Sequence, residues 1–143
     1  FQMLYKAKSI KLMYNLDFIS IDYLQLLNCP YSNGKSSNQI VSEISKSIRE
    51  MAKELEVPVL ALSQLNRALE LRKDRRPMLY DLRDSGSLEQ DAYAVLSLYR
   101  EEQYTGQSKG LAEIGILKNR NGVTVPGISM MWDAERMKFK DKF

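Results

Sequence analysis

The spacing of apolar residues predicts one long amphipathic helix between two buried strands. Apolar side chains recur at steps of three or four over residues 39–56, at Ile40, Ile44, Ile48, Met51 and Leu55. The segments on either side, DFISID (17–22) and VPVLALS (57–63), are short, apolar and rich in β-branched residues, as buried strands are. A strand, a helix and a second strand in this order are typical of a βαβ unit with a parallel sheet.

The rest of the chain is predicted to hold one more helix and three more strands. Residues 1–16 alternate lysines with apolar residues at helical spacing, whereas the polar, basic residues 64–91 predict short helical turns joined by loops. Strands are predicted at 92–100, 111–120 and 125–132, and the last two could pair as neighbours. We therefore expect an α/β fold with a mostly parallel central sheet flanked by helices, forming one domain over residues 1–143.

The amino-acid composition excludes several kinds of catalytic and metal site. The sequence has no histidine, which excludes Ser–His and Cys–His catalysis and every metal site that contains histidine. Its single cysteine, Cys29, cannot form an internal disulfide, which suits a reducing, cytoplasmic compartment. The longest apolar run is interrupted by Asp22 and is too short for a membrane span. The net charge of +3 is compatible with an anionic partner but does not identify one.

Two polar side chains follow the two predicted strands of the βαβ unit. Asp22 closes the first strand, and Ser63 and Gln64 follow the second. The carboxyl ends of parallel strands are where open α/β sheets bind ligands, and nucleotide-hydrolysing enzymes place an aspartate there to hold Mg²⁺. An amide at the same edge can hydrogen-bond a γ-phosphate or the attacking water. The alternatives are an aspartate that caps a turn and an ordinary exposed glutamine.

Basic and small residues follow the second strand. Residues 67–76 hold five cations and two acids, and in DLRDSGSLEQDA (81–92) Arg83 precedes Ser85, Gly86 and Ser87. Small residues let a nucleic-acid backbone approach main-chain N–H groups, while arginine supplies charge. A solvated loop is the usual outcome for a run of charges and remains the alternative.

Lys118 and Arg120 are two residues apart on a predicted strand, so we expect both to point to one face. Two adjacent cations repel each other unless an anion lies between them. At a subunit boundary they could neutralise a neighbour's γ-phosphate, as an arginine finger does. A basic strand end at an exposed edge is the alternative, and spacing alone does not decide between them.

NGKSS (33–37) resembles only half of the phosphate-binding loop G-x-x-x-x-G-K-[ST]. Cys29 occupies the position of the first glycine, and Pro30 stiffens the segment. The apolar YLQLL (23–27) also intervenes, whereas a phosphate loop follows its strand directly. We therefore expect Lys35 to belong to a loop that faces solvent or DNA.

Four blocks of the sequence, in order, resemble the DnaB family of hexameric replicative DNA helicases. They are IDYLQLL (21–27), EISKSIREMAKELEVPVLALSQLNR (43–67), RRPMLYDLRDSGSLEQDA (75–92) and AEIGILKNRNG (112–122). Residues 123–139 resemble the family less, because Val-Thr-Val stands where the family has Pro-Thr-Gly. This departure leaves the geometry of the final hairpin open and is typical of a divergent branch, such as a plasmid- or phage-borne helicase.

The resemblance implies a RecA-like motor that encircles single-stranded DNA as a hexamer, with ATP bound between subunits. It implies that Asp22 is the Walker B residue acting on Mg²⁺, through water, and that Gln64 is the sensor between the γ-phosphate and DNA. Lys118 and Arg120 match the pair that reaches the adjacent subunit's nucleotide.

The resemblance also implies contacts with DNA and with other replication proteins. Arg83, Asp84 and Gly86 match the family's DNA-contacting loop, in which backbone N–H groups hold phosphates. A primase and a helicase loader are implied as partners, through regions of the family that these 143 residues do not contain.

Other family features also have no counterpart in the sequence. The complete phosphate loop and the family's catalytic glutamate are missing, so the resemblance implies a chain truncated at its N-terminal side and inactive as an ATPase alone. Since the phosphate-loop strand is central in RecA-like sheets, we expect a gap between the strand ending at Gln64 and the strand beginning near Leu111. An open edge invites association, so we expect strand rearrangement or pairing with another copy.

Two other functions stay open on the sequence. One is a RecA-like ATPase that is not a helicase, against which the SGSLEQDA block argues. The other is a non-catalytic module for DNA binding or oligomerisation. ATP turnover separates both enzymes from the module, and strand displacement separates the helicase from the other ATPase.

Overall fold

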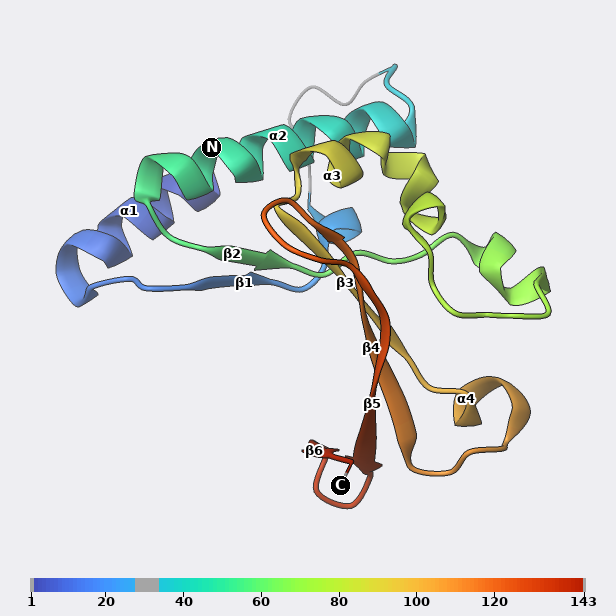
Figure 1. Ribbon diagram of the computed structural model, residues 1–143. Helices are drawn as coiled ribbons and strands as arrows, with labels where there is room; N and C mark the ends of the chain where they lie inside the picture. The colour runs from blue at the N-terminus through green and yellow to red at the C-terminus, as the bar shows by residue number, and fades with distance from the viewer. Residues whose placement is uncertain (1, 28–33, 143) are drawn as a thin grey trace. The chain divides into compact units, whose positions relative to one another are not determined.

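The computed structural model describes residues 2–27 and 34–142, except for the side chains of residues 83–85. Within these ranges the chain forms two compact units (Figure 1). Unit 1 comprises residues 1–66 and 82–91, and unit 2 comprises residues 67–81 and 92–143. The sequence shows no such boundary.

Unit 1 contains the predicted βαβ arrangement. Strands β1 (Ile19–Ile21) and β2 (Val59–Ala61) pair in parallel, with Ile21 opposite Ala61, and helix α2 (Ser37–Leu55) connects them. Figure 1 shows α2 along one face of this strand pair. The α/β class and the parallel pairing are thus as predicted. Among the described residues β2 pairs only with β1, so its other edge is open.

The ends of α2 follow from local sequence. The Ser36 side chain accepts a hydrogen bond from the Gln39 backbone N–H, and the Gln39 side chain accepts one from the Ser36 backbone N–H. This capping box satisfies donors that have no partner inside the helix. At the other end Glu56 takes the left-handed conformation (φ 50°) and Pro58 follows. The helix therefore begins two residues earlier than its apolar pattern predicts.

The core of unit 1 lies between the helices and the strand pair. Helix α1 (Gln2–Tyr14) contributes Ala7, whereas the apolar Met13 is 64% exposed. The short 3₁₀ helix η1 (Leu24–Leu26) contributes Leu24, which is 2% exposed. The remaining buried members of this core are Ile21, Ile44, Ile48, Met51, Leu55 and Val57. The predicted buried face of α2 is confirmed.

The polar segment after β2 forms short helical turns, as predicted. The 3₁₀ helix η2 (Arg67–Leu71) belongs to unit 2, and the boundary between the units falls inside η3 (Leu79–Ser85). Helix α3 (Gly86–Asp91) follows directly and belongs to unit 1.

Unit 2 contains a four-stranded antiparallel sheet with the strand order β3–β4–β5–β6. Its elements are β3 (Ala94–Tyr99), α4 (Glu102–Thr105), β4 (Leu111–Asn119), β5 (Val125–Asp133) and β6 (Lys138–Asp141). The predicted pairing of the strands at 111–120 and 125–132 is confirmed. These strands form their own antiparallel sheet, rather than extending the parallel one, because short connections join antiparallel neighbours.

One sequence prediction about the sheet is wrong in part: among the described residues β2 has the expected open edge, but β4 does not. We expected the strand beginning near Leu111 to border a gap, yet β4 is paired on both edges, with β3 and with β5. The edge strands of this sheet are β3 and β6. Strand β4 is internal because it forms hairpins with both of its sequence neighbours.

None of the helices in the described ranges combines the length and the apolar character needed to cross a bilayer.

Candidate functional site

The carboxyl ends of β1 and β2 lie side by side. The Leu62 N–H donates to the Ile21 carbonyl (2.9 Å), and the Leu24 N–H donates to the Leu62 carbonyl (3.0 Å), so main-chain pairing continues past both strands. Asp22, directly after β1, and Gln64, three residues after β2, are both exposed. The sequence predicts both residues at one edge of a parallel sheet, and the structure has them at the same edge.

Gln25 links the two strand ends, and sequence reasoning missed it. Its side-chain oxygen accepts from the Gln64 backbone N–H (3.2 Å), and its side-chain nitrogen donates to the Gln64 carbonyl (3.4 Å). The same nitrogen donates to the Ser63 hydroxyl (3.1 Å). The one signal in the sequence is a single polar residue inside the apolar run YLQLL. The segment carrying Gln64 is therefore held by a side chain from the Asp22 side of the site.

The acidic residues present fit Mg²⁺ held mainly by water and phosphate. Within the described residues, no three His, Cys, Asp or Glu side chains gather as a metal-binding group. Mg²⁺ commonly keeps several waters and takes only one or two protein carboxylates beside the phosphates of its nucleotide. The single exposed carboxylate of Asp22 is sufficient for that form of binding but not for a site built from protein ligands alone.

The partial phosphate-loop sequence has a structural role. Lys35 Nζ lies 2.6 Å from a carboxylate oxygen of Glu43, and Ser36 caps α2. Gly34 has a positive φ of 79°, as the turn into the helix requires. Cys29, Pro30 and Asn33 lie outside the described residues. The lysine and serine thus help to begin and stabilise α2.

Arg83, Asp84 and Gly86 lie where η3 passes into α3. Arg83 and Asp84 belong to η3, and their side chains are outside the described part of the structure. Gly86 is exposed and begins α3. Apart from its chain neighbours and the backbone of its own helix, a Cβ atom built on Gly86 would meet no described atom within 4 Å. Packing therefore gives no reason for glycine at this position.

Helix α3 is fastened to α2 by polar contacts. Asp91, at its end, accepts from the Ser45 hydroxyl (2.8 Å) and from the Arg49 guanidinium (3.0 Å). The Ser87 hydroxyl donates to the Ser42 hydroxyl (2.9 Å). Ser45 is only 5% exposed, so its hydroxyl requires a partner. These bonds fix the segment that follows Arg83 and Asp84 against the helix that connects the two parallel strands.

Lys118 and Arg120 lie against the residues that lead into β3. Lys118 Nζ donates to the Ala92 carbonyl (2.9 Å), and the Arg120 guanidinium carbon lies 5.9 Å from the centre of the Tyr93 ring. The Arg120 N–H also donates to the Tyr93 carbonyl (3.0 Å). Strand β4 ends at Asn119, so Arg120 lies in the following turn rather than on the predicted strand. The two cations come from one end of β4 and contact neighbouring residues.

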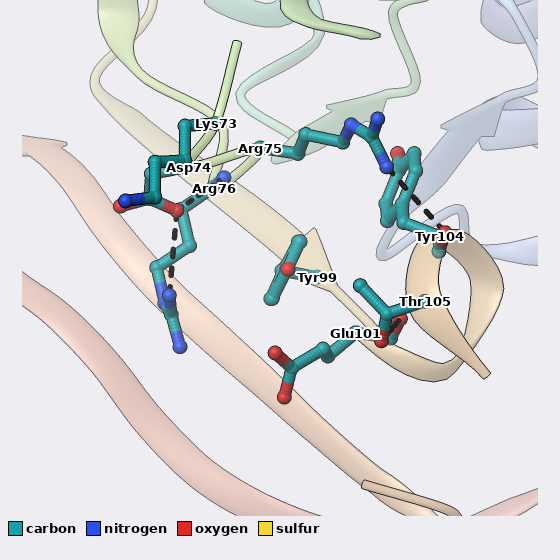
Figure 2. A pocket seen from close by; sticks show the side chains of 8 residues that line it. All are labelled: Lys73, Asp74, Arg75, Arg76, Tyr99, Glu101, Tyr104 and Thr105. Atoms are coloured by element: carbon teal, nitrogen blue, oxygen red, sulfur yellow. Dashed lines mark hydrogen bonds and ion pairs between the residues drawn. The ribbon is translucent and has the colours of Figure 1, made fainter. Parts of the chain in front are cut away.

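Three arginines of the basic segment 67–76 make internal contacts within unit 2. The Arg72 guanidinium donates a hydrogen bond to the carboxylate of the buried Asp81 (2.7 Å). The Arg76 guanidinium donates to both carboxylate oxygens of Glu113 (2.7 Å each). The Arg75 guanidinium lies over the Tyr104 ring, 5.4 Å from its centre (Figure 2). These contacts favour a structural role for the three arginines, although Arg76 is exposed, as Arg67 and Lys73 are.

Arg76 of this pair lines a cavity of about 400 Å³, shown in Figure 2. Residues 73–76 line it together with Tyr99, Glu101, Tyr104 and Thr105. Hydrogen bonds from Arg76 lower the pKa of the Glu113 carboxyl, and the same bonds raise the pKa of Arg76. Burial raises the pKa of the Tyr99 hydroxyl, whose ring lies under the Arg76 guanidinium. The pair therefore stays ionised at neutral pH and ties the basic segment to β4.

Comparison with known proteins gives consistent results. The replicative DNA helicase DnaB of Geobacillus stearothermophilus is 49% identical over 119 residues, covering 82% of this chain and 26% of that protein. The Pasteurella multocida DnaB is 54% identical over 111 residues, covering 75% of this chain and 23% of that protein. The chain thus spans about a quarter of the length of these curated relatives.

Solved structures agree with the sequence relatives. One solved ATPase domain matches with a TM-score of 0.90 and 39% identity, over 99% of this chain and 50% of that chain. A DnaB-like replicative helicase, solved in a study of its interactions with primase, matches with the same score and identity over 34% of its length. These matches establish the RecA-like fold. The family model for the DnaB-like helicase C-terminal domain matches residues 1–141, and the chain therefore belongs to this family.

Proposed function

We propose that this chain forms part of the motor of a hexameric, ATP-dependent replicative DNA helicase that acts in the cytoplasm and translocates on single-stranded DNA. The observation that carries the proposal is the shared edge of β1 and β2, where Asp22 and Gln64 follow adjacent parallel strands. Family membership supports the same interpretation. A non-catalytic module would not need a carboxylate and an amide at this edge.

In this proposal Asp22 and Gln64 serve one nucleotide. Asp22 would hold Mg²⁺ through water, and that ion would supply positive charge to offset the charge of the phosphates. Gln64 hydrogen-bonds the γ-phosphate or the attacking water, and its loss of that partner after hydrolysis signals to the DNA-contacting residues. Lys118 and Arg120 serve the nucleotide of the adjacent subunit, where a cation supplied in trans stabilises charge on the transferred phosphoryl group.

In this proposal Arg83, Asp84 and Gly86 contact DNA. Arginine supplies charge for a phosphate, and the open space around Gly86 allows a DNA backbone to approach main-chain N–H groups. The contacts of Asp91 with Ser45 and Arg49 support a fixed position for this segment.

We also propose a primase and a helicase loader as partners of the whole protein. One solved relative was studied for its interactions with primase.

The 143 residues contain no complete phosphate loop. We therefore expect no measurable ATP turnover by this chain alone, and we use "intact helicase" for a polypeptide that carries these residues together with a phosphate loop. Robust turnover by the 143-residue chain would overturn this part of the proposal.

The test of the proposal is Asp22→Asn in the intact helicase. We expect ATP turnover to fall by at least about 100-fold, because the metal loses its protein carboxylate, and strand displacement on a forked duplex to be lost with it. Asp17→Asn is the matched control, since it removes the same charge from an exposed residue before the other end of β1. Unchanged turnover by Asp22→Asn would reject the assigned role. Normal turnover without strand displacement in the unmodified protein would favour a RecA-like ATPase that is not a helicase.

A further inference from the structure

We propose that Gln25 is a positioning residue for Gln64, and that it sets how well Gln64 reports on the nucleotide. This inference rests on the proposed function of Gln64. Gln25 is not among the predicted site residues, and it lies in η1, on the Asp22 side of the site.

The main-chain ladder between the strand ends stops short of Gln64. Among the described residues, the last main-chain bond between the two segments joins the Leu24 N–H to the Leu62 carbonyl (3.0 Å). Beyond this point the Gln25 side chain takes the place of a main-chain hydrogen-bonding partner. Its carboxamide has both an acceptor and a donor, and it uses them on the N–H (3.2 Å) and the carbonyl (3.4 Å) of Gln64. One side chain thus extends the pairing as far as Gln64.

Gln25 can hold Gln64 only if Gln25 is itself fixed. It is the middle residue of η1, whose turn is closed by bonds from the Leu26 N–H to the Tyr23 carbonyl (3.1 Å) and from the Leu27 N–H to the Leu24 carbonyl (3.1 Å). Leu24 is 2% exposed and belongs to the core of unit 1. The exposed carboxamide therefore stands on a turn anchored in the core.

We expect loss of the Gln25–Gln64 hydrogen bonds to affect ATP turnover more than it affects folding. Gln25 and Gln64 are both exposed, and hydrogen bonds between exposed groups contribute little to the stability of the fold. A reacting-site group displaced by about 1 Å, in contrast, can slow a reaction by on the order of 100-fold. Loss of the Gln25 carboxamide should therefore alter turnover while leaving folding and nucleotide binding nearly unchanged.

The experiment uses Gln25→Met in the intact helicase, because methionine keeps the length of the side chain and removes its hydrogen bonds. We expect kcat for DNA-stimulated ATP turnover to fall by about tenfold, with the KM for ATP changed by less than about twofold. Gln103→Met is the matched control, since Gln103 is an exposed glutamine in α4 of unit 2. We expect that variant to behave as the unmodified protein does.

A double-mutant cycle separates positioning from a general structural effect. In a Gln64→Ala background the carboxamide that Gln25 positions is gone, so adding Gln25→Met should cause no further fall in kcat. Independent losses that multiply in the double variant would overturn the inference, and so would a Gln25→Met variant with unchanged kcat. If Gln64→Ala alone left kcat unchanged, the proposed sensor role itself would fail, which is a different outcome.

Discussion

Gly86 is a glycine for which the described fold gives no reason. Its φ is not positive, and a Cβ atom there would meet open space. Because Gly86 is the first residue of α3 and alanine is a better helix former than glycine, Gly86→Ala should not lower the melting temperature. We expect the same substitution to weaken the binding of single-stranded DNA to the intact helicase by about tenfold, because a methyl group holds the DNA backbone away from main-chain N–H groups.

Fluorescence anisotropy with a labelled oligonucleotide measures this affinity, and Gly115→Ala is the contrasting variant. A Cβ on Gly115 would lie 2.5 Å from the Ser97 hydroxyl oxygen and 3.0 Å from the Pro126 carbonyl oxygen. We expect Gly115→Ala to destabilise unit 2 by about 1–3 kcal/mol, with DNA affinity unchanged while the protein is folded. DNA binding by Gly86→Ala as tight as that of the unmodified protein would show that close backbone approach is not needed.

The sequence could predict the position of a site residue only where that residue lies close to the end of a strand. Asp22 and Gln64 follow apolar strands directly or within three residues, so their common edge could be predicted from the βαβ order alone. Gln25 could not, because its contact with Gln64 depends on the register of two segments beyond their strands. Arg120 was placed on a strand and lies in a turn, since β4 ends one residue earlier.

At the scale of elements, the Arg76–Glu113 pair connects the basic segment to β4. Because Arg76 lowers the pKa of Glu113 below its ordinary value of 4.5, the carboxyl binds a proton more readily in the unfolded chain. The pair therefore contributes stability that is present above a pH of about 4.5 and is lost as the pH falls through the lower, folded-state pKa. Arg76 is 45% exposed, so solvent screening keeps this contribution modest.

Urea denaturation of the 143-residue chain at several pH values tests this link. We expect Glu113→Gln to reduce stability at neutral pH by roughly 1 kcal/mol or less, and to reduce the loss of stability below a pH of about 4.5. The control is Glu135→Gln, at an exposed residue in the turn between β5 and β6. A Glu113→Gln variant with the same acid sensitivity as the control would mean that the pair does not stabilise the fold.

Elements with a strong local signal were the ones that sequence could predict. Helix α2 has a continuous apolar stripe, a capping serine and a proline after its end, and its buried face is as predicted. The elements α4 and β6 were missed, because four-residue segments of mostly polar composition carry no period. Apolar content indicated where β3, β4 and β5 lie, but sheet membership depends on pairing between distant residues.

At the scale of the whole molecule, one reaction is proposed to be divided between subunits. Asp22 and Gln64 act on a nucleotide bound by their own subunit in this proposal, whereas Arg120 acts on the nucleotide of a neighbour. Such a division is possible in a ring with head-to-tail interfaces, where each interface joins two different surfaces. The two groups of residues belong to unit 1 and unit 2, respectively.

Mixed oligomers of inactive variants of the intact helicase test this division most directly. If Asp22→Asn and Arg120→Ala affect opposite sides of each interface, a 1:1 mixture leaves about a quarter of the interfaces with both groups intact. We expect ATP turnover to reappear in that mixture, and none to reappear when Asp22→Asn is mixed with Gln64→Ala, because those two residues serve the same site. Recovery in the second mixture, or none in the first once mixed oligomers have formed, would contradict the division of the reaction between subunits.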